Sequence, residues 1–175
     1  MEVNRLLSTS YPEKVFKRGV IFAINTGLQH SDIIDLQWSH LHNNTDGSVI
    51  LSKRIVKTRY NLIVPLNKAA ISVLGRRDKG QVFKGFPGNA EANRMFKEWL
   101  AKAKITKNLT FHAARHTFAM SAVSRGVDIY ALKELLGHVR IENTLIYAKM
   151  RPERLIAEMR KMEDEGQKGM VLQEH

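Results

Sequence analysis

A run of turn-forming residues, Asn43 to Gly47, most strongly limits the folds open to this chain. Asn, Asp and Gly tolerate left-handed backbone or bond their own backbone, so a run of them interrupts any helix. Beyond it, short apolar segments predict strands at Ser48–Leu51, Arg54–Lys57 and Leu62–Leu66. Elsewhere the apolar residues recur at helical spacing. We therefore expect an α+β fold, mostly helical, with a small three-stranded antiparallel sheet.

Local start and stop signals predict where the helices lie. Glycine readily adopts the left-handed conformation at a helix end, and Ser, Asp and Asn cap helix starts. The expected helices cover 13–26 before Gly27, Asp32–Gln37 after Ser31, Asn67 to about Arg77, Asn89 to about Lys102, Thr110 or Phe111 to Ser124 before Gly126, Ile129–Leu136 between Asp128 and Gly137, a segment that holds Tyr147, and Pro152 to about Glu163.

The chain is basic, with a formal net charge of +11 at pH 7. A positive field of this size attracts polyanions such as nucleic acid, although charge alone leaves open a basic protein without a special partner. The 175 residues suit one domain, 1–175, with 165–175 as a flexible tail. There is no cysteine, no long apolar run and no secretory h-region at the start, so we expect a cytoplasmic protein without a membrane span.

The C-terminal third carries a group of residues suited to handling a phosphodiester. It contains His112-Ala-Ala-Arg115, then Leu136-Gly137-His138, then Tyr147. An arginine grips phosphate with a planar fork of donors, histidine moves protons near neutral pH, and a tyrosine hydroxyl can attack phosphorus. Each has a plainer interpretation alone: a surface arginine with a half-buried histidine, a helix end, and a core tyrosine. A zinc face at His112 and His116 lacks further ligands, so we expect no metal.

Order and spacing together make this pattern similar to the catalytic domain of the tyrosine recombinases, the phage integrase family. Arg115 precedes His138 by 23 positions, and Tyr147 follows His138 by 9. The resemblance implies that Arg115 binds the scissile phosphate and that His112 helps proton transfer. It also implies that His138 bonds a non-bridging oxygen and that Tyr147 is the nucleophile.

The predicted hairpin adds basic residues to this resemblance. Lys57 stands in Lys-Thr-Arg-Tyr-Asn-Leu-Ile-Val-Pro-Leu, where the family carries the lysine that protonates the leaving 5′ oxygen. Lys53, Arg54 and Arg59 bring further positive charge, which favours a contact with the DNA backbone. The alternative is that Lys57 is a solvated lysine on a sheet edge.

One position departs from the family pattern. In Thr26-Gly27-Leu28-Gln29, glutamine replaces the family's first arginine, and Asp32 matches the acid that orients it. Loss of one preorganised donor commonly costs about 10²–10³ in rate. Gln29 can be engineered, it can be natural with Arg54, Arg59 or His30 compensating, or it can mark a recombinase-fold module that binds DNA without cutting it.

The resemblance extends from about Leu6 to Arg160 and implies a site-specific DNA recombinase or integrase. Its reaction needs no cofactor and passes through a 3′-phosphotyrosyl intermediate. The implied partners are double-stranded DNA and further protomers, with a tetramer on DNA and a monomer without it. The N-terminal core-binding domain of the family has no counterpart in this sequence. Three alternative functions are a non-catalytic DNA-binding module, a type IB topoisomerase, and a basic helical interaction protein in which the motif arose by chance. The topoisomerase would have to wrap DNA more fully than a chain this short can.

Overall fold

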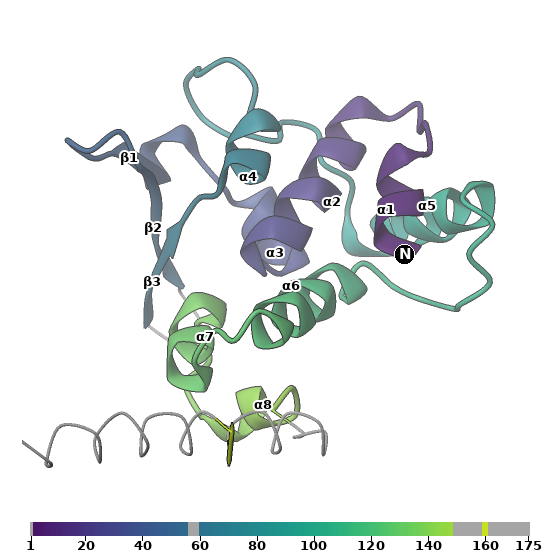
Figure 1. Cartoon of the computed structure of the whole chain (residues 1–175). Coiled ribbons are helices and arrows are strands. Elements are labelled where there is room, and N and C mark those ends of the chain that lie inside the picture. Colours follow the sequence, from purple (N-terminus) through teal and green to yellow (C-terminus); the bar gives the residue numbers. More distant parts are fainter. Residues whose placement is uncertain (1, 56–59, 149–158, 161–175) are drawn as a thin grey trace, which may run out of the picture.

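The computed structural model describes residues 2–55, 60–148 and 159–160 (Figure 1). The elements follow in the order α1 (Glu2–Ser8), α2 (Lys14–Thr26), α3 (His30–Ile34), the 3-10 turn η1 (Trp38–His40), β1 (Leu41–Asn43), β2 (Val49–Ile55), β3 (Tyr60–Pro65), α4 (Lys68–Ser72), α5 (Asn89–Lys102), α6 (Ala113–Ser124), α7 (Ile129–Leu136) and α8 (Glu142–Leu145). This confirms the predicted α+β class and its predominance of helix.

The three strands form one antiparallel sheet, as predicted, and their order in it is β1-β2-β3. Leu41 pairs with Leu51, and Leu51 with Val64, so a buried apolar row crosses the sheet. The predicted strand positions were partly wrong. The first strand begins before the turn run. Ser48–Leu51 and the described part of Arg54–Lys57, residues 54–55, are not separate strands, because β2 runs without a break from Val49 to Ile55. Residues 56–57 lie outside the described residues.

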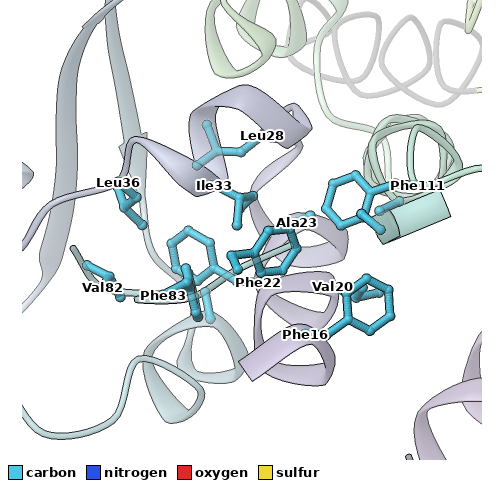
Figure 2. Close-up of a cluster of buried hydrophobic side chains, with 14 of the residues drawn as sticks. Phe16, Val20, Phe22, Ala23, Leu28, Ile33, Leu36, Val82, Phe83 and Phe111 are labelled. Atoms are coloured by element: carbon cyan, nitrogen blue, oxygen red, sulfur yellow. The ribbon is translucent and has the colours of Figure 1, made fainter. Parts of the chain in front are cut away.

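The core forms around α2, which packs against α4 and α6 (Figure 1). Figure 2 shows how aromatic side chains from α2 meet residues of α3 and the 82–83 segment. Phe22 lies with its ring centroid 5.4 Å from that of Phe83, and both side chains are buried. Burial of this apolar surface holds α2 and α3 in fixed positions, and the loop between them contributes to the site described below.

Several helix ends differ from the sequence prediction. Gln29, not Ser31, precedes the first turn of α3, and α4 stops at Ser72 rather than near Arg77. Tyr147 lies just beyond the short helix α8 rather than within a helix. Helix α1 was not predicted, since it has no strong cap residue. Of the predicted helix from Pro152 to Glu163 only residues 159–160 are described, and the tail 165–175 lies outside the described residues.

Helix α7 agrees with its prediction at both ends. The Asp128 side chain accepts hydrogen bonds from the backbone N–H groups of Tyr130 and Ala131, at 2.9 and 3.1 Å. Gly137 ends the helix in the left-handed conformation, with φ +63°. These two signals fix where α7 stops and hence where His138 begins.

Candidate active site

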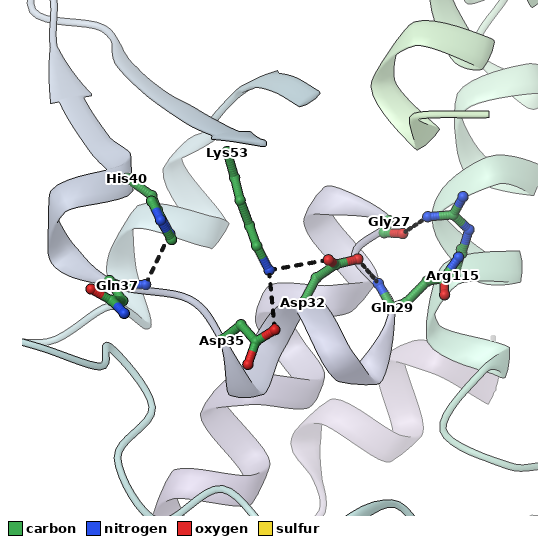
Figure 3. A network of polar contacts seen from close by, with 8 residues as sticks. All are labelled: Gly27, Gln29, Asp32, Asp35, Gln37, His40, Lys53 and Arg115. Carbon is green, nitrogen blue, oxygen red and sulfur yellow. Dashed lines mark hydrogen bonds and ion pairs between the residues drawn. The ribbon is translucent and has the colours of Figure 1, made fainter. Parts of the chain in front are cut away.

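Arg115 is the buried centre of the candidate site, with only 4% of its surface exposed. It projects from the first turn of α6. Nη1 donates to the Gly27 carbonyl (Figure 3) and Nη2 donates to the Leu136 carbonyl, each at 2.7 Å. These carbonyls end α2 and α7, so the guanidinium joins three helices. Because guanidinium carries five N–H donors, the remaining ones can bind an anion.

His138 lies two residues beyond one of these anchors. Its Nδ1 is 2.8 Å from Oγ1 of Thr144, a fully buried residue of α8. Burial lowers the pKa of His138 to about 4, and the charges of Arg115 and Lys133 act in the same direction. The ring is therefore neutral at pH 7 and can donate from one nitrogen only.

Tyr147 is packed in a small apolar cluster on α6 and α7 and is 7% exposed. Burial raises the pKa of the Tyr147 phenol above its ordinary value, while Arg115 acts to lower it. The ring contacts the ring of His116, with centroids 5.5 Å apart, and His116 contacts His112 at 4.6 Å. The rings of His112, which precedes the first residue of α6, and of His116 thus form a row that ends at the Tyr147 ring.

Four residues selected from sequence therefore share one neighbourhood. The Arg115 charge reaches Tyr147 and both histidines, because it contributes to the pKa of each. Partial burial is the main cause of the lowered pKa of His112. Two residues of this neighbourhood, Thr144 and His116, were not expected to take part in phosphate chemistry, and the only role weighed for His116 was that of a metal ligand. The spacing of His112 and His116, one helical turn apart, could have indicated His116.

The loop after α2 forms a second part of the site (Figure 3). Asp32 Oδ2 accepts from the backbone N–H of Gln29 at 3.3 Å, and Oδ1 lies 3.2 Å from Lys53 Nζ. Gln29 itself is exposed and brings no charge. Lys53 therefore stands beside the carboxylate that the resemblance associates with an arginine at position 29.

The basic hairpin residues are placed differently from one another. Lys53 was expected at the DNA, yet it is 9% exposed and ion-paired, because β2 turns it to the same face as Leu51. Arg54 is exposed on the opposite face, as a DNA contact requires. Lys57 and Arg59 lie outside the described residues.

One ring nitrogen of His30, the residue after Gln29, is already engaged. Its Nε2 is 2.9 Å from the Pro87 carbonyl oxygen, and its ring packs on Phe86 and Phe111. These contacts fix the His30 ring against Pro87, Phe86 and Phe111, and compensation by this histidine stays a prediction.

The described part of the chain contains neither a helix suited to span a membrane nor a cluster of side chains suited to hold a metal ion. Within residues 2–55, 60–148 and 159–160, no helix is long and apolar enough to cross a membrane. In the same part, no three His, Asp or Glu side chains are grouped so that they could hold a metal ion.

Comparisons with a family profile and with individual known proteins point to the same family. The sequence profile of the phage integrase family matches residues 1–154. Tyrosine recombinase XerC of Mesorhizobium japonicum is 30% identical over 141 residues, which are 75% of this chain and 45% of that protein. The chain spans about half the length of the curated relatives it matches, 45% and 52% for two of them.

Solved structures agree with this family. The catalytic domain of bacteriophage HP1 integrase superposes with a TM-score of 0.66 at 26% identity, over 91% of this chain and 90% of that one. The XerH site-specific recombinase bound to its difH substrate has a TM-score of 0.72 at 17% identity, over 90% of this chain and 52% of that one. The second likeness concerns the fold alone.

Proposed function

The chain belongs to the phage integrase family, and on that premise we propose that it cuts and rejoins DNA through a 3′-phosphotyrosyl intermediate. The observation that carries the proposal is the placement of Arg115. It is buried, fixed by two carbonyls, and electrostatically coupled to His112, His138 and Tyr147. A single phosphate in contact with the free donors of Arg115 would have a nucleophile and two histidines around it.

Phosphate binding falls to Arg115 and His138. The two carbonyl bonds pre-orient the Arg115 fork, so little side-chain freedom is lost when phosphate binds. We assign the Thr144 hydroxyl as the donor to Nδ1 of the neutral His138 ring, the tautomer that keeps the ring proton on Nε2. That nitrogen then donates to a non-bridging oxygen, and the bond strengthens as charge builds up on the phosphorane.

The reaction itself is a transesterification. The Tyr147 oxygen attacks phosphorus as the phenol passes its proton to His112, a role that rests on the family resemblance, and the bond to the 5′ oxygen breaks. Lys57 protonates the leaving oxygen, a role that rests on the family resemblance alone. The phosphotyrosyl bond preserves the energy of the cleaved bond, so a 5′ hydroxyl can reverse the step without ATP or a cofactor.

The proposed partner is duplex DNA, and the net charge of +11 supports it. Exchange of strands between two duplexes requires four active tyrosines. We therefore expect four protomers on DNA and a monomer without it.

The test is recovery of a covalent protein–DNA adduct. The chain is incubated with nicked duplexes of randomised sequence, and adducts are isolated under denaturing conditions. We expect an adduct that Tyr147→Phe abolishes and that Tyr130→Phe leaves unchanged, because Tyr130 is an exposed tyrosine outside the site. An adduct that survives Tyr147→Phe would contradict the assignment of the nucleophile.

A second function, DNA binding without efficient cleavage, is favoured by one observation. Gln29 is uncharged, and Asp32 beside it is already paired with Lys53. The phosphorane would then lack one charged donor, at a cost of about 10²–10³ in rate. Salt-dependent DNA binding without any adduct, even with the chain's own target site, would support this second function over the first.

A further inference from the structure

The Asp32 carboxylate has both oxygens engaged, and neither partner is an arginine. One oxygen accepts the N–H of Gln29, which opens α3, and the other faces the Lys53 ammonium of β2 (Figure 3). The side chains of Lys53 and Asp32 are only 8% and 12% exposed. Asp35, which is exposed, lies 3.9 Å from the same ammonium. The pair joins two elements that are 21 positions apart in sequence.

A buried carboxylate without a cation is unfavourable, and here it would also oppose phosphate binding. The charge of Asp32 is felt at Arg115, since it contributes to the pKa of the guanidinium. An unneutralised Asp32 would therefore set a negative charge near the phosphate that Arg115 is proposed to bind. The Lys53 ammonium compensates the negative charge of Asp32 within the protein, so the phosphate does not meet an unpaired carboxylate.

We propose that Lys53 is the positioning residue that balances Asp32 in place of an arginine at position 29. The proposal deepens the proposed function and rests on it for its activity arm only. Lys53 does not touch the phosphate. It neutralises Asp32 and holds the start of α3 against β2.

It follows that an arginine at position 29 and Lys53 compete for one carboxylate. A bidentate arginine needs both carboxylate oxygens turned toward its fork, yet they already point to Lys53 and to the helix N–H. Two cations on one largely buried carboxylate would leave one of them poorly compensated. Gln29→Arg alone should therefore restore little, whereas Gln29→Arg combined with Lys53→Met should form the arginine pair.

The experiment compares the parent, Gln29→Arg, Lys53→Met and the double variant. Arg54→Met is the matched control, because it removes one positive charge from the exposed face of the same strand. The first readout is the melting midpoint. We expect Lys53→Met to lower it by roughly 5–15 °C, the double variant to recover at least half of that loss, and Arg54→Met to change it little.

The second readout is lysine reactivity toward reductive methylation, followed by mass spectrometry. In the parent, Lys53 should react about 10-fold or more slowly than exposed Lys84, and Gln29→Arg should speed its modification. The third readout is adduct formation. Gln29→Arg alone should gain less than about 10-fold, and the double variant about 10²-fold over Lys53→Met.

The outcomes separate the two proposals. No recovery of the melting midpoint in the double variant would overturn the role of Lys53. A full gain in cleavage from Gln29→Arg alone, with Lys53 still protected, would overturn it as well. Recovery of the midpoint without an adduct in any variant would leave the pairing standing and remove the proposed cleavage function.

Discussion

Replacement of Gly137 by alanine should disturb both the fold and the site. Gly137 has φ +63°, and a Cβ there would lie 3.0 Å from Ile55 Cδ1 and 3.2 Å from Leu62 Cδ1. The left-handed backbone costs an L-residue roughly 1–2 kcal/mol, and crowding in a packed place adds about 1–3 kcal/mol. We expect the free energy of unfolding to fall by about 2–5 kcal/mol in Gly137→Ala.

Gly126→Ala is the matched control for backbone strain. Gly126 has φ +82°, and a Cβ there would meet nothing within 4 Å. Its substitution should cost only the conformational part, about 1–2 kcal/mol. The difference between the two variants in urea unfolding, followed by tryptophan fluorescence, isolates the packing of Gly137 against β2 and β3.

The effect on function should be specific to Gly137. The carbonyl of Leu136 anchors Arg115, and His138 follows Gly137 directly, so a small shift of this turn moves both proposed phosphate ligands. Adduct formation, measured well below the melting midpoint, should fall about 10-fold or more in Gly137→Ala and stay near the parent rate in Gly126→Ala. Equal losses of stability and activity in the two variants would refute this reasoning.

Three further predictions concern charge and protonation. If about six phosphates are neutralised, the logarithm of the DNA-binding constant should fall with the logarithm of salt at a slope near −5, and a slope near zero in a duplex titration would exclude phosphate contacts. Arg115→Lys should reduce adduct formation by about 10²–10³, because an ammonium cannot hold two carbonyls and a phosphate in one plane; a near-parental rate would show that the fork is dispensable. The pKa of His138, lowered to about 4, makes its neutral form the stabilised one. The stability that the neutral ring gives to the native state is therefore complete above about pH 6.5 and is lost as the pH falls toward 4. Over that range, the melting midpoint of the parent should drop more steeply than the melting midpoint of His138→Gln.

The sequence predicted best what local signals determine. Helix α7 was placed correctly because Asp128 and Gly137 mark its ends within the helix's own segment. The first strand was missed because Leu41–Asn43 becomes a strand only by pairing with β2, across the turn run. A three-residue segment carries no periodicity of its own to reveal this.

In the candidate site, too, the residues could be predicted from a pattern, whereas their partners from distant segments could not. The grouping of Arg115, His138 and Tyr147 was anticipated from a pattern, yet the anchors of Arg115 were not, since Gly27 lies 88 residues away in sequence. Lys53 was misjudged as a surface contact. The alternation in β2 with buried Leu51 contained the necessary signal, but the carboxylate that receives Lys53 comes from another element.

The attachment of Arg115 to the ends of α2 and α7 makes formation of the candidate site depend on folding of the whole domain. Neither carbonyl is in place until both helices have docked on α6, so the guanidinium cannot take its position in a partly folded chain. If the proposed function holds, such a chain would carry the same positive charge and could adhere to DNA, but it would lack the phosphate site that cleavage needs. The anchoring would then tie the proposed cleavage activity to completion of the native structure.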